Sequence, residues 1–533
     1  MIFDPFFFPY PSRRRLVYAG NGMVATSQYL AAQAGLDILK KGGNAIDAAV
    51  AAAACLTVVE PTSNGIGGDA FAIIWYQGKL YGLNASGPAP KSISWQLVRE
   101  LGYREMPKLG WLPVTVPGTP SAWATLHRTF GSISFSEILK PAINYAERGF
   151  PVSSVVSRQW GIAFKRYAAS KDESLQSWFS TFAPFRKTPE PGEIWKLPQQ
   201  AETLQLIADS RAETFYRGAL AEKIASFSQK NGGYLRREDL DEYSPEWVEP
   251  IKINYRGYDL WEIPPNGQGL ITLMALNILN GFKFLSKDDP QTYHLQIEAM
   301  KLAFSVGKEV ITDPKEMRVR VEELLTPNYA ERQRRLIGEE AFSPCSAKPL
   351  QGGTVYLATA DNQGNVVSYI QSNYTGFGSG IVIPGTGIAL QNRGNTFSLN
   401  PQDANCLKPG KKTYHTIIPG FLTGEKEVAA FGVMGAYMQP QGQLQVISNI
   451  LDFKLNPQAA LDAPRWQWVE EKKVKVEQLF PHFMAERLVR KGHQIEMELS
   501  SDSFGKGQII WRDFQGVLMG ATDPRADGMV AAW

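Results

Sequence analysis

Alternating apolar and polar positions predict a β-hairpin in the second half of the chain. Two strand-like runs, residues 354–360 and 366–372, flank the turn-forming cluster 361–365. A five-residue loop at that position sets the register of the hairpin and places Thr354 directly opposite Ser372. Two facing hydroxyl groups at the open end of a hairpin suggest a chemical site, although an ordinary surface hairpin has the same pattern.

The helical pattern near the start of the chain predicts two consecutive helices. From Ser27 onward apolar residues recur on one side, and the pattern stops at Gly42-Gly43 after two lysines. Asn44 is placed to cap a second helix, with Asp47 at its third position. That helix, residues 45–56, consists almost entirely of small side chains. Small side chains permit close approach, so we expect this helix to be central.

Strand and helix patterns continue to the end of the chain. Strand-like segments are expected at residues 70–76, 80–84, 249–263, 428–433, 507–511 and 516–520. Helical periodicity is expected at residues 134–148, 199–231, 270–280, 292–306 and 440–451. Residues 340–353 are rich in Pro, Gly and Ser and predict a flexible segment directly before the hairpin. With 533 residues, two or three domains or one large shared core would both fit.

Composition and charge narrow the class of partner. The chain is 44% hydrophobic and 20% charged, which is typical of a globular protein with a large interior. The formal net charge is +3, and the sharpest basic run is only Arg13-Arg14-Arg15. We therefore expect neither nucleic acid nor a membrane surface as a partner. The most membrane-like stretch, Ala45 to Val59, contains Asp47 and is shorter than the roughly 20 residues needed to span a bilayer.

Cysteine and histidine usage indicates an intracellular protein without a metal. Three widely spaced cysteines cannot form a disulfide framework and are typical of a reducing compartment. The five histidines form no His-x-x-x-His pair, and no Cys-x-x-Cys is present, so no zinc site is expected. The first ten residues lack the order of a signal peptide. These features predict a cytoplasmic location.

Gly353 and Thr354 can support self-cleavage. A threonine hydroxyl can attack the preceding carbonyl, and glycine at 353 leaves room for the strained geometry. Hydrolysis of the resulting ester would leave Thr354 as a new N-terminus, whose amine, with an intrinsic pKa near 8, can act as the base for its own hydroxyl. Ser372 could orient that hydroxyl. Such a nucleophile forms an acyl-enzyme from an amide.

The tetrahedral oxyanion of that reaction needs hydrogen-bond donors. Gly435 and Ala436 lie between a predicted strand and a predicted helix N-terminus, where backbone N–H groups and the positive helix end are available. A plain strand-to-helix turn explains the same two residues, and the pattern alone leaves both interpretations open.

Several ordered motifs resemble the γ-glutamyltransferase family of N-terminal nucleophile hydrolases. They cover nearly the whole chain, at residues 22–25, 35–50, 59–61, 65–68, 116–120, 215–218, 352–354 and 523–525. The resemblance implies an α/β (α+β) fold, a four-layer αββα sandwich. It also implies cleavage into a heavy chain, 1–353, and a light chain, 354–533, intertwined as one structural domain. It assigns the nucleophile to Thr354, the partner hydroxyl to Ser372, and the oxyanion donors to Gly435 and Ala436.

The sequence departs from the family pattern where the substrate would bind. Ser86-Gly87 stands where the family usually has an Arg-Glu pair that holds the substrate α-carboxylate, and a serine cannot replace that arginine. Tyr374 and Arg393 with Thr396 stand where the family binds the α-amino group, and His415-Thr416 replaces a serine pair. Arg393 could supply a relocated positive charge for an acidic acyl group or form a structural ion pair.

These departures resemble the branch of oxamate amidohydrolases and glutaryl-type cephalosporin acylases. The leading hypothesis is a self-processing amidohydrolase or acyl transferase that needs no cofactor and acts on a small amide, with a carboxylate on the substrate as one option. Ser86, Tyr374, Arg393 and His415 are its candidate substrate-binding residues. A true γ-glutamyltransferase and an inactive, uncleaved scaffold are the alternatives. The expected partners are the substrate and the two chains of one precursor, and a homodimer of that pair stays open.

Overall fold

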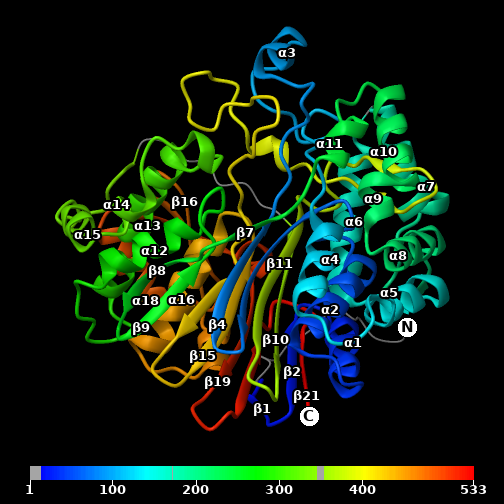
Figure 1. Ribbon diagram of the computed structural model, residues 1–533. Helices are drawn as coiled ribbons and strands as arrows, with labels where there is room; N and C mark the ends of the chain where they lie inside the picture. Colours follow the sequence, from blue (N-terminus) through cyan, green and yellow to red (C-terminus); the bar gives the residue numbers. More distant parts are fainter. Residues whose placement is uncertain (1–13, 171, 345–352) are drawn as a thin grey trace.

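Two seven-stranded sheets pack face to face between two layers of helices (Figure 1). The computed structural model describes residues 14–170, 172–344 and 353–533. In the order of neighbouring strands, the first sheet is β1 (Val17–Ala19), β20 (Leu518–Thr522), β19 (Lys506–Arg512), β15 (Val428–Met434), β14 (Gly420–Thr423), β9 (Tyr258–Glu262) and β8 (Ile251–Tyr255). The second is β21 (Met529–Ala532), β2 (Gly22–Thr26), β10 (Gly353–Asp361), β11 (Val366–Tyr374), β3 (Asp69–Tyr76), β4 (Lys79–Ala85) and β7 (Glu246–Val248).

Helices cover the outer face of each sheet, on the right and on the left of Figure 1. The layer against the second sheet contains α1 (Tyr29–Lys40), α2 (Ala45–Val59), α4 (Thr119–Phe130), α5 (Phe135–Arg148), α6 (Ser154–Ala168), α8 (Pro198–Ser210) and α10 (Ala219–Lys230). The layer against the first contains α12 (Gly269–Leu279), α13 (Pro290–Val310), α15 (Pro327–Arg334), α16 (Met438–Leu451), α17 (Pro457–Asp462) and α18 (His482–Arg490). The predicted four-layer αββα sandwich is confirmed.

Shorter elements complete the fold. The short helices are α3 (Trp95–Glu100), α7 (Gln176–Phe182), α9 (Glu213–Arg217), α11 (Arg237–Asp241) and α14 (Val321–Leu324). The remaining strands are β5 (Phe150–Pro151), β6 (Ile194–Trp195), β12 (Val382–Ile383), β13 (Ile388–Ala389), β16 (Trp466–Glu470), β17 (Lys473–Glu477) and β18 (Gln494–Glu498). No helix in the described ranges combines the length and apolar character needed to cross a bilayer.

The central hairpin is buried on both faces because it lies inside the sandwich. Val355 and Leu357 of β10 pack into the core beneath α2, whereas Tyr356 and Ala358 pack into the core between the two sheets. This follows from the two-residue period of a strand, which turns successive side chains to opposite faces. α2 is buried along its whole length, and its small residues allow it to lie close to β10 and β11. The predicted central position of this helix is confirmed.

The predicted helix cap and hairpin register are confirmed as well. The Asn44 side chain accepts hydrogen bonds from the backbone N–H groups of Ile46 and Asp47, and the Asp47 carboxylate accepts one from the Asn44 backbone N–H. Residues 355–360 pair with 371–366 in the predicted register, but the register shifts between Gly353 and Val355, so the predicted direct pairing of Thr354 with Ser372 falls at this irregularity. β11 also pairs with β3, which brings Ser372 beside Asp69.

Strands from both sides of Gly353 contribute to both sheets. β2, β3, β4 and β7 precede it in the second sheet, whereas β10, β11 and β21 include or follow it. The first sheet is divided in the same way. The predicted flexible segment before the hairpin falls largely on residues 345–352, which lie outside the described residues.

Candidate functional site

A chain of hydroxyl contacts joins Thr354 to the carbonyl group that precedes it. The Thr354 hydroxyl donates to Ser372 Oγ at 3.1 Å, and Ser372 Oγ donates to the Gly353 carbonyl oxygen at 2.7 Å. The backbone N–H of Tyr374 donates to Ser372 Oγ at 2.8 Å. Because these donors occupy the lone pairs of Ser372, its own proton is directed at Gly353. Both side chains are buried, so bulk water does not compete for these hydrogen bonds.

Arg393 places a positive charge next to this hydroxyl pair. It lies in the turn after β13 and is fully buried. Its guanidinium donates to Thr416 Oγ1 at 2.7 Å and, more weakly, to Ser372 Oγ at 3.4 Å. The guanidinium carbon lies 4.4 Å from the centre of the Tyr374 ring, in the geometry of a cation–π contact. Burial lowers the pKa of Arg393 to about 10.

Asp69 and His415 form a buried pair beside Arg393. His415 Nδ1 accepts from the Ile417 backbone N–H at 3.3 Å, which leaves the proton on Nε2, 3.1 Å from Asp69 Oδ2. Gly87 N–H and Gln391 Nε2 donate to the other carboxylate oxygen, at 3.1 and 2.8 Å. Burial raises the pKa of Asp69 to about 7, against the opposing effect of Arg393, and burial holds the pKa of His415 well below its usual range. His415 is therefore neutral at physiological pH.

Ser86 is held by asparagine side chains. Its hydroxyl donates to Asn84 Oδ1 at 2.7 Å and to Asn266 Oδ1 at 3.3 Å, and it is buried. The next residue, Gly87, reaches Asp69 through its backbone. Ser86 thus supports the loop that holds Asp69, and among the described residues its hydroxyl makes no hydrogen bond to Thr354, Ser372 or Arg393.

The Gly435–Ala436 turn adopts a backbone conformation suited to presenting N–H groups. φ is 137° at Gly435 and 51° at Ala436, both in the range that favours glycine. The Gln268 side chain donates to the Ala436 carbonyl at 2.8 Å and holds the turn in place. Among the described residues, neither Gly435 N–H nor Ala436 N–H donates a hydrogen bond. Gly435 and Gly353 line the same cavity of about 170 Å³.

The structure therefore brings together most of the predicted site residues. Thr354, Ser372, Tyr374 and Arg393 form one contact network, His415 joins it through Asp69, and Gly435 lines the same cavity as Gly353. Sequence reasoning missed Asp69 and the two glutamines, Gln268 and Gln391. Asp69 directly follows the glycine loop 65–68, and this position could have indicated a functional carboxylate. No feature of the sequence indicates a role for the two glutamines.

A second group of polar side chains has metal-ligand chemistry, which the sequence spacing did not predict. His294, Glu298 and His493 offer ligand atoms within 4.8 Å of one another. Most of these atoms are already engaged: the two imidazoles hydrogen-bond each other at 2.9 Å, and Glu298 accepts from Lys301 at 2.8 Å and from the Phe342 N–H at 2.9 Å. Only His493 Nδ1 lacks a partner among the described residues. The Lys301 ammonium already supplies a positive charge beside Glu298. The cluster fits a structural polar network better than a metal site.

The fold and the hydroxyl pair define a class of protein, the N-terminal nucleophile hydrolases. More specifically, the chain belongs to the gamma-glutamyltranspeptidase family, whose model matches residues 31–533. It is 37% identical over 520 residues to the glutathione hydrolase-like YwrD proenzyme of Bacillus subtilis (strain 168), covering 95% of this chain and 97% of that protein. It is 36% identical over 530 residues to the oxamate amidohydrolase proenzyme of Klebsiella pneumoniae, covering 96% and 98%.

One solved structure has a higher sequence identity to this chain than these two relatives have. The crystal structure of cephalosporin acylase from Bacillus halodurans matches with a TM-score of 0.97 and 59% sequence identity, covering 100% of this chain and 99% of that chain. The predicted resemblance to the branch of oxamate amidohydrolases and cephalosporin acylases is confirmed. The protein is an enzyme, a self-processing amidohydrolase of this family.

Proposed function

We propose that Thr354 cuts the chain before itself and then serves as the nucleophile of the mature enzyme. In the first step Thr354 Oγ attacks the Gly353 carbonyl carbon, passes its proton to Ser372, and Ser372 passes its own proton to the carbonyl oxygen. The C–N bond then breaks, the nitrogen takes up a proton, and an ester joins Gly353 to Thr354 Oγ. Water hydrolyses the ester, releasing Gly353 as a carboxylate. The hydrogen-bond chain from Thr354 through Ser372 to Gly353 is the observation that carries this proposal.

After cleavage, the heavy chain 1–353 and the light chain 354–533 stay together as one structural domain. The new α-amino group of Thr354 takes the proton from its own hydroxyl as that hydroxyl attacks the substrate amide. Gly435 and Ala436 donate their N–H groups to the oxyanion, and the leaving amine receives the proton. Water then attacks the acyl-enzyme. Transfer of the acyl group to a second amine instead of water uses the same steps.

Arg393 supports an acyl group that carries a carboxylate. The Arg393 guanidinium and the Thr354 hydroxyl both contact Ser372 Oγ. The distance between them is therefore at most the sum of two hydrogen-bond lengths. A carboxylate bound there has to lie close to the reacting carbonyl. Acyl groups with zero to three carbons between the two carboxyl carbons fit this distance better than longer ones. Oxamate is the member of this series with no carbon between them. Arginine binds a carboxylate well because it is permanently charged and offers paired donors.

γ-Glutamyl transfer is the second candidate, favoured by family membership alone. The Ser86 hydroxyl is committed to Asn84 and Asn266 and carries no charge for a substrate α-carboxylate. The amidohydrolase assignment therefore has the better support. A cytoplasmic location is part of the proposal and rests on Cys55 and Cys406, which are buried and free thiols.

Intact-mass analysis of the purified protein tests the cleavage. We expect two fragments that meet at Gly353–Thr354 in the wild type, a single 59.1 kDa chain in Thr354→Ala, and strongly slowed cleavage in Ser372→Ala. Ser368→Ala is the matched control, since Ser368 is a buried serine on the same strand whose hydroxyl contacts Tyr356 instead. An uncut wild-type chain would overturn the proposal.

Activity on a series of amides tests the substrate class. Oxamate, malonamate, succinamate and glutaramate differ only in the number of carbons between carboxylate and amide. We expect the shorter members to give the highest kcat/KM and a γ-glutamyl anilide to give the lowest. Preference for the γ-glutamyl anilide would favour the second candidate.

A further inference from the structure

Gln268 lies before the proposed cut, and its side chain is hydrogen-bonded to three residues that follow it. Gln268 directly precedes α12 and is excluded from solvent. Its Nε2 donates to the Thr416 carbonyl at 2.6 Å and to the Ala436 carbonyl at 2.8 Å, and its Oε1 accepts from the Tyr414 hydroxyl at 2.7 Å. One amide therefore bridges the loop that contacts Arg393 and the proposed oxyanion turn.

The Tyr414 hydroxyl fixes the orientation of the Gln268 amide. A glutamine amide has an acceptor oxygen and an NH2 group with two donors. Because the hydroxyl donates to Oε1, the NH2 group faces the Thr416 and Ala436 carbonyls, and both of its N–H groups are used. The reversed amide would place its oxygen against two carbonyl oxygens. Tyr414 is buried as well, so bulk water does not compete for these contacts.

Ala436 needs this support because its backbone conformation is unfavourable for alanine. Its φ of 51° lies in the left-handed region, where a Cβ atom is crowded by the backbone. Rotation of the Gly435–Ala436 peptide by half a turn would bring φ of Ala436 into the extended region that alanine prefers. Gly435 can follow that rotation because it has no Cβ atom. The rotated peptide would point the Ala436 N–H in the opposite direction.

Hydrogen bonds to two carbonyl groups oppose this rotation. The Met438 N–H donates to the Gly435 carbonyl at 2.9 Å, and the carbonyl and N–H of a trans peptide point in opposite directions. The Ala436 N–H is thereby directed away from α16, and in the described part of the chain it donates to no other group. The Ala436 carbonyl accepts from Gln268 and, at 3.1 Å, from the Gln439 N–H. Of these three donors, Gln268 lies outside the turn and its helix, so it can be replaced without altering the turn itself.

We propose that Gln268 is a positioning residue for the oxyanion site, and that its amide keeps the Ala436 N–H directed at the oxygen of the reacting carbonyl. The proposal rests on the proposed amide hydrolysis at Thr354 and adds a residue on which the rate of that reaction depends. Two backbone hydrogen bonds hold the neighbouring loop without this side chain, from the Gln268 N–H to the His415 carbonyl and from the His415 N–H to the Asn266 carbonyl. Loss of the amide should therefore affect the chemical step more than substrate binding.

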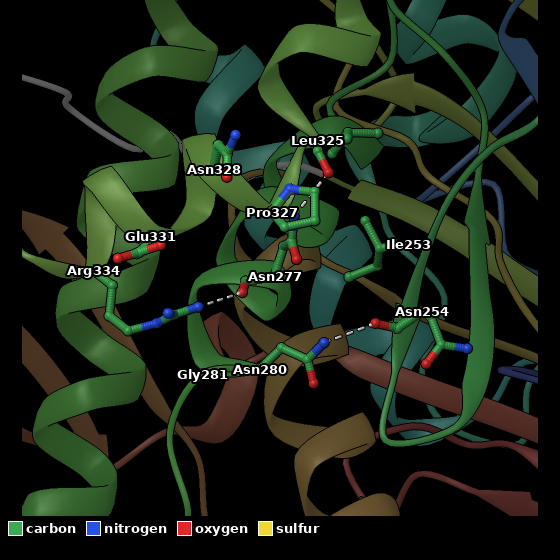
Figure 2. A pocket seen from close by; sticks show the side chains of 10 residues that line it. All are labelled: Ile253, Asn254, Asn277, Asn280, Gly281, Leu325, Pro327, Asn328, Glu331 and Arg334. Atoms are coloured by element: carbon green, nitrogen blue, oxygen red, sulfur yellow. Dashed lines mark hydrogen bonds between the residues drawn. The ribbon is translucent and has the colours of Figure 1, made fainter.

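The other end of α12 provides a matched comparison (Figure 2). A cavity of about 410 Å³ lies there, and residues of β8, α12 and α15 contribute to its lining. Asn277 donates to the Leu325 carbonyl at 2.9 Å, and Asn280 donates to the Asn254 carbonyl at 3.0 Å. These amides hold backbone carbonyls as Gln268 does, but none of the residues that they hold belongs to the predicted site. Asn277→Leu therefore controls for the loss of a buried amide on the same helix.

Steady-state kinetics of the cleaved enzyme test the proposal. Gln268→Met removes both donors and keeps a side chain of similar size. We expect kcat for the best amide to fall by about 10–100-fold, less than the loss on removing an oxyanion donor itself, while KM changes by less than about threefold. Tyr414→Phe leaves the amide free to turn and should cause a smaller loss of kcat. Asn277→Leu should change neither kcat nor KM.

Glycine at position 436 distinguishes a positioning role from a general loss of structure. Glycine adopts the left-handed region without strain, so the turn of an Ala436→Gly variant depends less on Gln268. Adding Ala436→Gly to Gln268→Met should therefore raise kcat by roughly fivefold or more relative to Gln268→Met alone. A packing defect at position 268 would not be repaired by this change.

A boronic acid tests the turn without turnover. 3-Boronopropanoate is succinamate with a B(OH)2 group in place of the amide. Thr354 Oγ adds to the boron, the hydroxyl proton passes to the α-amino group, and the tetrahedral boron places one of its oxygens where the oxyanion forms. By calorimetry with the cleaved enzyme, we expect the Kd to rise about tenfold in Gln268→Met and to stay unchanged in Asn277→Leu, because an analogue of the transition state depends on the oxyanion donors.

Two results would overturn the proposal. One is a Gln268→Met enzyme with the kcat and the boronate affinity of the wild type, and the other is a loss of kcat that Ala436→Gly does not reduce. If Gln268→Met remains uncut, Tyr414→Phe takes its place, and an unchanged kcat in that variant is the contradicting result. Failure of the proposed function is distinct, because it appears as an uncut wild-type chain by intact mass.

Discussion

Two buried arginines, Arg393 and Arg465, stabilise a buried positive charge in different ways. Both are almost completely excluded from solvent. Arg465 pairs with Asp523 at 2.7 Å and also donates to the carbonyls of Phe504 and Gly505, both at 3.0 Å. Arg393 has no carboxylate in hydrogen-bond contact among the described residues and relies on two hydroxyl groups and an aromatic ring.

We propose that this difference separates a structural charge, on Arg465, from a charge that is available to a ligand, on Arg393. Although burial alone would raise the pKa of Asp523, Arg465 and Arg525 lower it, so the carboxylate stays ionised and the network stays paired. Around Arg393 the nearest acid, Asp69, is turned toward His415 and Gln391. A buried cation without its own anion is costly, and such groups concentrate where a substrate supplies the missing charge.

The largest effect is expected from breaking the structural pair. Arg465→Met removes one of the two arginines that pair with Asp523, since Arg525 remains at 3.1 Å, and leaves the carbonyls of Phe504 and Gly505 without their donor. It should lower the free energy of unfolding by about 3 kcal/mol, the lower end of the range for breaking a buried ion pair. Arg393→Met removes a cation that has no carboxylate partner to orphan and should cost much less. Urea unfolding of both uncut precursors, in a Thr354→Ala background, measures the two values. Equal losses would show that Arg393 is structural too.

Enzymatic activity should fall more in Arg393→Met than in Arg465→Met, the reverse of the order expected for stability. Arg393→Met should lower kcat/KM for the best carboxylated amide by about 10–100-fold, because a hydrogen bond to a charged group contributes roughly 1.5–3 kcal/mol. The loss should be much smaller with an uncharged amide of equal length, such as a neutral analogue of oxamate. Arg393→Lys should recover part of the activity, since it keeps the charge and loses the paired donors. A uniform loss on charged and neutral substrates would argue against carboxylate binding.

Local features of the structure could be predicted from the sequence, whereas the contacts of these arginines could not. The hairpin register followed from the turn cluster 361–365, and the α2 cap followed from Asn44 and Asp47, because both depend on residues that are near neighbours in the chain. The contact of Arg393 with Ser372 spans 21 residues and that of His415 with Asp69 spans 346. Such contacts depend on how the layers pack, and no periodicity or turn signal encodes them. The resemblance pointed to Arg393 but left open whether it supplies a charge for an acidic acyl group or forms a structural ion pair.

The ionisation of Asp69 should make substrate binding at Arg393 depend on pH. With its pKa raised to about 7 by burial, Asp69 loses its charge as the pH falls through 7, and Arg393 is then less compensated. KM for a carboxylated amide should therefore decrease from pH 8 to pH 6, by a few-fold. Asp69→Asn should remove this dependence, whereas titration of the Thr354 amine, which acts on kcat, should persist. An unchanged KM profile in Asp69→Asn would contradict the assignment.

The same raised pKa fixes the sign of a stability effect. An acid whose folded-state pKa exceeds its unfolded value binds more protons in the folded state between the two values, so stability falls as the pH rises from about 4 to about 7. In the Thr354→Ala precursor, Asp69→Asn should flatten that part of the stability curve. Denaturant midpoints at pH 5 and pH 7 measure it.

The smallest effect is expected at Ser86, where the family usually has an arginine. Ser86 donates to Asn84 and Asn266, and within the described ranges it makes no hydrogen bond to Thr354 or Ser372. Ser86→Ala should cost about 1 kcal/mol of stability, the typical contribution of a neutral hydrogen bond, and should change KM by less than twofold. Arg393→Met, in the same assay, is the reference for a large change. A tenfold rise in KM for Ser86→Ala would mean that the substrate reaches the old arginine position, and that Arg393 has not taken over its role.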